Sequence, residues 1–307
     1  MQLTELAVRA PTPQDAAGIA EVLNAHAAAT GRAADETSEG VARWFELEDL
    51  DPAHDMFLAV QGERIMGYAD VTAPGAAREV VYIDLRVLPG EERVVERLLE
   101  EAERRAAELA GAGARVRAPA NEGDDEYRAA LSRHGFVVVR SSYTMKIDLE
   151  GPSEEPLWPD GLASRPFRRG EERAVYDAYV EAFGDHWGFV PESFADWCTW
   201  NLGPNADTSL WRLVVDDGEI AAVCLSKPSR GDDDTVGWVA VLAVRSPWRR
   251  RGLARALLLE SFGLFRSIGR PRAALGVDSE NTTGALALYE SVGMRATSRS
   301  DTWERVL

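Results

Sequence analysis

The feature that most constrains this chain is a stretch at residues 239–259 that reads as a strand, a basic turn with a glycine, and then a helix. Its first part is apolar, its turn runs Arg-Arg-Arg-Gly-Leu-Ala from Arg249 to Ala254, and apolar residues then recur at helical spacing. Backbone N–H groups at the start of a helix point outward, and the helix dipole adds positive potential there. Gly252 lets the backbone approach an anion without a Cβ in the way. The stretch therefore predicts a phosphate-binding turn, although an exposed basic turn without a ligand would have the same sequence pattern.

A second group of motifs follows this stretch. A strand is expected at 272–277, and after it come Asn281, a short helix with Ala-x-x-Leu-Tyr ending at Tyr289, and a Gly-Met turn at Gly293. The Arg-x-x-Gly-x-Ala turn, the Asn, the helix and the Gly-Met turn occur in the order and at the spacing typical of the GNAT acetyltransferase superfamily. The chain from about residue 162 to residue 307 therefore resembles that family.

The resemblance implies where acetyl-CoA, the co-substrate of the family, would bind. In GNAT proteins the pantetheine arm lies between two separated central strands, so backbone groups of Leu242 and Val244 would hydrogen-bond it and polarise the thioester. The arginines of the turn would supply charge-assisted contacts at the rim of the phosphate site. The full set expected to bind the cofactor is Leu242, Ala243, Val244, Arg249, Arg250, Arg251, Gly252, Leu253, Ala254, Arg255 and Asn281.

By the same resemblance, Tyr289 is the expected general acid. It would protonate the thiolate that leaves when the amide forms. A free thiol has a pKa of about 8.5 and a phenol one of about 10, so the transfer is modestly uphill if the protein lowers the pKa of the phenol. The alternative interpretation of Tyr289 is a half-buried helix aromatic with a satisfied hydroxyl.

The general base is less well defined than the acid. An alkyl ammonium has a pKa of about 10.4, so a base or a water chain must take its proton before attack. His186, between the first two helices expected in this half, is the first candidate, and a histidine that only fixes its loop is an equal alternative. Glu192 and Asp185 are weaker candidates. In the mycothiol acetyltransferase family a glutamate lies on the central strand, but the nearest equivalent in this chain is Trp238, which cannot act as a base.

The chain repeats itself once. Two β-hairpin patterns, two strand ends and two helix ends match each other, separated each time by 156 or 158 residues. A near-constant offset through three motifs indicates a duplicated domain, and such tandem domains resemble the architecture of the mycothiol acetyltransferase family. The matching positions are Gly62 and Gly218, Pro89 and Pro247, and Gly135 and Gly293.

These patterns predict an α/β (α+β) protein of two tandem GNAT-like domains, each with a mixed, mostly antiparallel central sheet flanked by helices. The first domain is expected at residues 1–149, a Pro/Gly/acidic linker at 150–161, and the catalytic domain at 162–307. Each domain is expected to end in a strand of its own, at 142–148 and at 302–307.

The first copy lacks the chemistry of the phosphate-binding turn. When Pro89 is aligned with Pro247, Glu91 and Glu92 stand opposite two arginines, and Val94 stands opposite the glycine. Carboxylates repel a pyrophosphate, and a β-branched residue disfavours the backbone conformation that glycine permits. The first domain is therefore expected not to bind CoA and to serve as structural support, with an independent ligand site as the alternative.

Composition argues against several classes of protein. The net charge of -17 argues against nucleic acid as a partner, because a phosphate backbone needs a basic surface. No apolar run approaches the ~18 residues that span a bilayer, and the first residues show no signal-peptide pattern, so a cytoplasmic location without a membrane partner is expected. The two cysteines, Cys198 and Cys224, have no spacing typical of a metal site or a disulfide framework, so neither is expected.

Together these features predict an N-acetyltransferase that transfers the acetyl group of acetyl-CoA to the amine of a small molecule by direct attack. One alternative is a non-catalytic acyl-CoA-binding or sensing protein, because the base is undefined. Another is a peptidyl or aminoacyl transferase of tandem GNAT-like fold, although proteins of that type generally lack the phosphate-binding turn. The acceptor, the acyl length and the oligomeric state stay open.

Overall fold

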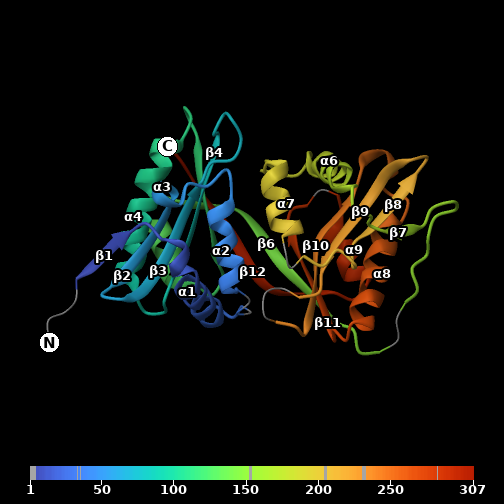
Figure 1. Cartoon of the computed structure of the whole chain (residues 1–307), viewed down its shortest axis with the longest axis horizontal. Coiled ribbons are helices and arrows are strands. Elements are labelled where there is room, and N and C mark those ends of the chain that lie inside the picture. The colour runs from blue at the N-terminus through green and yellow to red at the C-terminus, as the bar shows by residue number, and fades with distance from the viewer. Residues whose placement is uncertain are drawn as a thin grey trace. The chain divides into compact units, whose positions relative to one another are not determined.

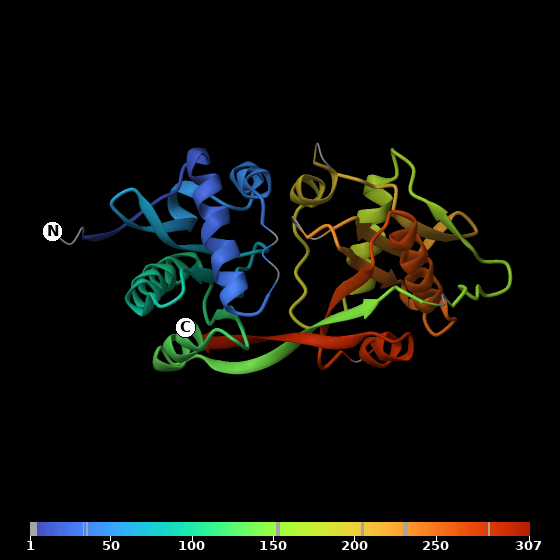
Figure 2. The same ribbon diagram turned by 90° about the horizontal axis from the view of Figure 1, so that it is seen from below.

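The computed structural model describes residues 5–32, 34, 36–151, 154–203, 206–229, 233–281 and 283–307. Parts of the ranges predicted as domains and linker lie outside the described residues, namely 1–4, 33, 35, 152–153, 204–205, 230–232 and 282. The chain divides into two compact units (Figures 1 and 2). Unit 1 comprises Met1–Ser142 and Ser298–Leu307, and unit 2 comprises Tyr143–Thr297.

The sheet of unit 1 has the strand order β1-β2-β3-β4-β5-β12-β6. These strands are β1 (Leu6–Arg9), β2 (Met56–Gln61), β3 (Arg64–Thr72), β4 (Val80–Val87), β5 (Arg115–Asn121), β6 (Val137–Asp148) and β12 (Arg295–Val306). The helices of this unit are η1 (Pro13–Asp15), α1 (Ala16–Ala29), α2 (Ser38–Ala42), η2 (Arg43–Glu46), α3 (Pro52–Asp55), α4 (Glu92–Leu109) and α5 (Asp125–Arg133).

Alternating apolar residues give the sheet of unit 1 two buried faces. Side chains alternate between the faces of a strand, and in β2 Leu58 and Ala59 accordingly belong to different hydrophobic clusters. Leu58 packs in the cluster of Ile19 from α1, whereas Ala59 packs in the cluster of Leu98 from α4. Helices α1 and α4 therefore cover opposite faces of this sheet (Figure 1).

The sheet of unit 2 has the strand order β12-β6-β11-β10-β9-β8-β7. Its remaining elements, in chain order, are β7 (Ser164–Pro166), α6 (Glu172–Phe183), α7 (Phe194–Leu202), β8 (Arg212–Asp216), β9 (Glu219–Lys227), β10 (Val236–Val244), η3 (Ser246–Trp248), α8 (Leu253–Ser267), β11 (Arg272–Asp278) and α9 (Ala285–Ser291). Apolar residues of α8 pack on one face of β10 with Val239, and those of α6 and α7 pack on the other with Ala243.

Both units repeat one pattern of strand directions. The β4–β5 and β10–β11 ladders are parallel. The ladders β1–β2, β2–β3, β3–β4, β7–β8, β8–β9, β9–β10 and β5–β12 are antiparallel. The predicted fold class, a mixed and mostly antiparallel sheet with helices in tandem copies, is therefore confirmed. None of the described helices is both long and apolar enough to cross a membrane.

The two long strands β6 and β12 each run from one unit into the other, which the repeat did not predict. Strand β6 leaves unit 1 after Ser142 and lies beside β11 in unit 2, while β12 enters unit 1 at Ser298. Residues 300–306 of β12 pair with the whole of β5, and Trp303 packs against the core of unit 1. Figure 2 shows β6 in green and β12 in red side by side. The last strand of the second copy thus completes the sheet of unit 1.

Gly237 brings α8 close to the central strand of unit 2. A Cβ at this position would lie 2.2 Å from Cδ1 of Phe265, a distance that real atoms do not adopt. Phe265 of α8 is fully buried and cannot swing away without leaving its core. The missing side chain on β10 therefore fixes how closely the helix that follows the basic turn lies on the sheet.

Because β12 completes the sheet of unit 1, unit 1 should depend on the C-terminal residues of the chain. A chain that ends at Arg299 lacks residues 300–306 of β12, so we expect amide hydrogen exchange of β5 to speed up by roughly tenfold or more, because this ladder is lost and only residues 115–117 keep their pairing with β4. Exchange in β9 and β10 of unit 2 should stay unchanged. A chain that lacks only Leu307 is the control. Loss of protection in β10 and β11 instead of β5 would contradict the pairing of β12 with β5.

Candidate active site

The site begins where two parallel strands of unit 2 part. Residues 236–239 of β10 pair with residues 272–275 of β11, and the described residues form no β10–β11 pair beyond this segment. The β10–β9 ladder has an irregularity between Val239 and Val241 at the same level. The carboxyl-terminal halves of β10 and β11 therefore diverge, which leaves one edge of β10 without a strand partner.

The register of β10 shows which backbone groups lie on that open edge. The N–H of Arg245 donates to the carbonyl of Ala221 on β9 at 3.0 Å, and Ala243 lies opposite Val223 on the same strand. Backbone groups alternate in direction along an antiparallel strand, so those of Ala243 face β9. Those of Leu242 and Val244 point away from β9, to the side that β11 has left. Of the three residues expected here, Leu242 and Val244 offer backbone groups to a ligand, and Ala243 holds the strand in the sheet.

The turn after β10 has the backbone conformation of an anion-binding loop. Arg250 and Gly252 have φ values of 62° and 86°, and α8 begins at the next residue, Leu253. Alternation of left- and right-handed residues turns successive N–H groups toward one point. A Cβ at Gly252 would meet nothing within 4 Å, so the glycine is needed for its positive φ rather than for space. Leu253 is buried in the core and anchors the helix start, while Ala254 is half-exposed.

Arg249 does not point toward the turn but toward the end of α6. Its Nε donates to the carbonyl of Val244 at 3.1 Å, and its Nη2 donates to the carbonyl of Ala182 at 2.8 Å. Its Nη1 lies 3.2 Å from the carboxylate of Asp185, which is 71% exposed. Arg249 therefore hydrogen-bonds the carbonyl of Val244 on the open edge of β10 and links this strand to the end of α6 and the loop after it.

The other arginines lie around the helix start. Arg255 pairs with Glu154 at 2.7 Å, and Arg251 lies 3.7 Å from Asp216. The exposed side chain of Arg250 has no partner among the described residues. Because exposed pairs contribute little, Arg251 and Arg255 remain available to a phosphate that competes for them.

Asn281 holds the helix that carries Tyr289. Its Oδ1 accepts from the N–H of Thr283 at 2.8 Å and from the N–H of Ala285 at 3.4 Å. This carbonyl oxygen therefore caps the start of α9, and only the amide NH2 of Asn281 is left for a ligand.

Tyr289 lies in the core rather than at the surface, with 7% of its area exposed. Burial, with a smaller contribution from Cys224, raises the pKa of Tyr289 to about 12. The sequence-based expectation required a lowered value, but the apolar surroundings disfavour the phenolate. The phenol therefore stays protonated at neutral pH and can donate its proton, although the transfer to a thiolate is more uphill than expected.

His186 lies at the same end of β10 and β11 as Arg249. Its ring packs on Phe183 of α6, with 4.4 Å between the ring centres. Burial lowers the pKa of His186 below 6.5, and the charge of Arg249 lowers it further, while Asp278 at the end of β11 acts in the opposite direction. The imidazole is therefore neutral at pH 7, as a base must be.

Glu192 occupies an aromatic environment that the sequence did not reveal. Burial raises the pKa of Glu192, and Asp196 adds to this, whereas a hydrogen bond from Tyr179 opposes it. The hydroxyl of Tyr176 donates to the backbone carbonyl of Glu192 at 2.6 Å. The two tyrosines lie three residues apart on α6, a spacing that only indicated a buried helix face. Asp185, the third candidate base, is engaged with Arg249.

Comparison with known proteins gives a family match within unit 2 and longer alignments with named relatives. A model of the Acetyltransferase (GNAT) family matches residues 172–294. Mycothiol acetyltransferase of Salinispora arenicola is 31% identical over 267 residues, which cover 83% of this chain and 82% of that protein. Mycothiol acetyltransferase of Streptomyces avermitilis is 30% identical over 195 residues, 63% of this chain and 62% of that protein, so this alignment spans less than two thirds of either.

Solved structures match the whole chain, including both units. A GCN5-related N-acetyltransferase from Sphaerobacter thermophilus is 31% identical with a TM-score of 0.76, covering 98% of this chain and 95% of that one. A tandem GNAT protein from the clavulanic acid biosynthesis pathway has a TM-score of 0.74 at 16% identity over 98% of both chains, a likeness of fold alone. With relatives above 30% identity along most of its length, and with diverging strands ahead of a positive-φ turn, the chain belongs to the GNAT acetyltransferase family.

Proposed function

We propose that unit 2 transfers the acetyl group of acetyl-CoA to the amine of a small molecule by direct attack. The observation that carries this proposal is the open edge of β10, which leads straight into the positive-φ turn at the start of α8. An extended amide-bearing chain with a phosphate at one end fits these two features together. The strand edge supplies hydrogen bonds to the chain, and the turn supplies N–H groups to the phosphate.

The donor is held by backbone groups in this proposal. The pyrophosphate binds the turn from Arg250 to Ala254, and the pantetheine follows Leu242 and Val244. Since Arg249 already binds the carbonyl of Val244, the donor amide competes with that guanidinium. A backbone N–H of the open edge polarises the thioester carbonyl, and one such donor typically contributes about 2.7 to 4 kcal/mol to catalysis.

Transfer needs one base and one acid. The acceptor ammonium gives a proton to His186, and the free amine attacks the thioester carbon. The C–S bond then breaks, and the thiolate receives the proton of Tyr289. His186 suits the first role because it is neutral at pH 7 and lies near the ends of β10 and β11. Glu192, whose carboxylate is partly desolvated beside Tyr179, is the second candidate for the base.

The acceptor is proposed only as a class. A small molecule with a primary amine agrees with direct attack and with the family of the chain. The names of the relatives make a mycothiol-related acceptor the first to be tested. A non-catalytic acyl-CoA-binding protein is the rival interpretation, and turnover with any amine excludes it.

Donor binding is tested by calorimetric titration of the whole chain with acetyl-CoA. We expect one site per chain, and we expect Gly252→Glu to weaken it by roughly 100-fold or more, because the variant puts a carboxylate and an unfavourable positive φ at the phosphate. Gly218→Glu, which changes a positive-φ turn glycine between β8 and β9 in the same way, is the matched control.

Three results would contradict the proposed donor site. Absence of acetyl-CoA binding removes the donor. Binding that survives Gly252→Glu places the donor elsewhere. A second site per chain means that unit 1 also binds acetyl-CoA, against the expectation from Glu91 and Glu92.

The acid and base are tested by the pH profile of acetyl transfer. The base works in its neutral form and burial lowers the pKa of His186, so the rate should rise with pH through a midpoint below 6.5 and then level off. Tyr289, with a pKa of about 12, keeps its proton across this range and causes no alkaline fall. His186→Gln should remove the acid limb, and Tyr289→Phe should lower the plateau by roughly tenfold or more with little change in donor affinity.

Glu192→Gln is the control for the base, since it tests the second candidate with the same loss of a proton acceptor. An acid limb that persists in His186→Gln and disappears in Glu192→Gln would move the base to Glu192. An unaltered plateau in Tyr289→Phe would remove the phenol from the mechanism.

A further inference from the structure

Unit 1 has an open strand edge like that of unit 2. Among the described residues, β4 and β5 pair only over a short segment, as β10 and β11 do. The N–H of Leu88 donates to the carbonyl of Met66 on β3, so the backbone groups of Leu85 and Val87 point away from β3. Val87 therefore corresponds to Val244, the last residue on the open edge of β10.

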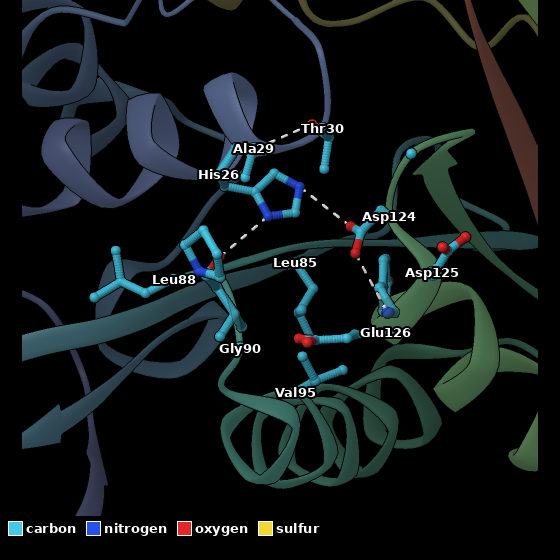
Figure 3. Close-up of a pocket in the computed structure, with 14 residues that line it drawn as sticks. His26, Ala29, Thr30, Leu85, Leu88, Gly90, Val95, Asp124, Asp125 and Glu126 are labelled. Carbon is cyan, nitrogen blue, oxygen red and sulfur yellow. Dashed lines mark hydrogen bonds and ion pairs between the residues drawn. The ribbon is translucent and has the colours of Figure 1, made fainter.

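In both units a side chain binds the carbonyl of this last residue and links it to the end of a helix. In unit 1, Nδ1 of His26 lies 3.1 Å from the carbonyl of Val87, and His26 belongs to the last turn of α1. Figure 3 shows His26 reaching from α1 toward this strand, at a cavity of about 200 Å³. In unit 2 the side chain comes from the basic turn instead. Nε of Arg249 binds the carbonyl of Val244, and Nη2 binds that of Ala182 at the end of α6.

Arg249 thereby caps the end of α6. This helix ends at Phe183, and the last carbonyls of a helix have no partner within it. The carbonyl of Ala182 is one of these, and it accepts from Nη2 of Arg249 at 2.8 Å. The bond is partly buried, and a cation is favourable at the negative end of the helix dipole. A residue of the basic turn therefore stabilises the end of α6.

The loop after α6 carries His186 directly behind this cap. The N–H of His186 donates to the carbonyl of Phe183 at 2.8 Å, and the two rings pack on each other. Nη1 of Arg249 lies 3.2 Å from the carboxylate of Asp185, the residue before His186. Because Asp185 is largely exposed, this ion pair contributes less than the bond to Ala182. The position of His186 thus depends on the end of α6 and, through it, on Arg249.

Three charged side chains act on His186. Burial is the largest cause of its lowered pKa, and the guanidinium of Arg249 lowers this pKa further. Asp278 at the end of β11 and Asp185 in the loop raise it. Without the charge of Arg249, only the two carboxylates would act on the ring. The imidazole should then hold its proton to higher pH.

The contacts of Arg249 leave little for a phosphate. Its three nitrogens are engaged within unit 2, Nε with Val244, Nη2 with Ala182 and Nη1 with Asp185. A phosphate could bind this guanidinium only by breaking one of these contacts. Arg255, by contrast, pairs only with an exposed glutamate near the start of α8 and is free to exchange it for a phosphate.

We propose that Arg249 is a positioning residue, which caps α6 and holds the loop of His186 in place, and that it does not bind the donor phosphate. Its importance for transfer rests on the proposed function of unit 2, in which His186 is the base. Its effects on the loop and on the charge of His186 do not depend on transfer. The basic turn thus serves both substrates, because its backbone faces the donor and its first side chain holds the loop on the acceptor side.

The test compares Arg249→Met, which removes both the cap and the charge, with Arg249→Lys, which keeps the charge but has one nitrogen in place of three. NMR titration follows the rings of the four histidines, with His186→Gln to assign the resonance. Amide hydrogen exchange follows the N–H groups of His186 and Phe189, which are bonded within the loop.

In Arg249→Met we expect the pKa of His186 to rise, because a positive charge beside it is lost. Exchange of the two loop amides should speed up by roughly tenfold or more, since the end of α6 loses its cap. In Arg249→Lys the amides should also exchange faster, while the pKa of His186 stays low. Where transfer is measurable, Arg249→Met should move its acid limb to higher pH and lower the plateau.

Calorimetric titration with acetyl-CoA separates the two roles of the turn. Both variants of Arg249 should bind acetyl-CoA as tightly as the wild type, because the phosphate meets backbone N–H groups of the turn. Arg255→Met is the matched variant, since it removes another guanidinium from the same region. It should weaken acetyl-CoA binding and leave the pKa of His186 and the exchange of the loop unchanged.

Two results would overturn the proposal. One is weaker acetyl-CoA binding in Arg249→Met without any change at His186, which would make Arg249 a phosphate ligand. The other is unchanged exchange of the loop amides in the variants of Arg249, and Arg249→Lys alone decides this if Arg249→Met does not fold. Failure of the proposed function is visible separately, as absent acetyl-CoA binding or absent turnover in the wild type, because the NMR and exchange measurements need neither.

Discussion

The structure depends on parallel strands that stay paired for only a few residues. A backbone group that loses its strand partner must find another donor or acceptor, because an unpaired buried amide is costly. In unit 2 the guanidinium of Arg249 covers the carbonyl of Val244, but nothing in the register of β10 supplies a partner strand for Leu242. Backbone groups on the open edge of β10 therefore lack a strand partner, and an extended ligand can hydrogen-bond to them. This edge leads to the start of α8, where a phosphate can bind.

The two units differ in what hydrogen-bonds to their open strand edges. In unit 1 the side chains of His26 and Arg86 bind the carbonyls of Val87 and Leu85 from within. The remaining space is small and lined by carboxylates instead of arginines. A duplicated fold thus holds one open strand edge whose backbone groups can bind a donor, and one whose carbonyls are bound by the chain's own side chains. The difference arises from a few side chains, since the course of the strands is the same.

The sequence predicted the features that are local and failed on those that depend on packing. Sequence patterns predicted the basic turn, Gly252 and the repeat, because the positions of glycine, charged and apolar residues determine local structure within a few residues. The direction of Arg249 was not, because its partners Ala182 and Asp185 lie more than sixty residues away. The raised pKa of Tyr289 follows from burial by distant strands and helices. The course of β6 and β12 from one unit into the other leaves no local signal, because it depends on pairing with strands that are distant in the sequence.

Residue-resolved amide hydrogen exchange with and without acetyl-CoA shows whether the open edge of β10 receives the donor. We expect slower exchange at Leu242, at Val244 and at the first residues of α8, with no change at the corresponding Leu85 and Val87 of unit 1. Protection confined to unit 1, or acetyl-CoA binding that leaves Leu242 and Val244 unprotected, would contradict it.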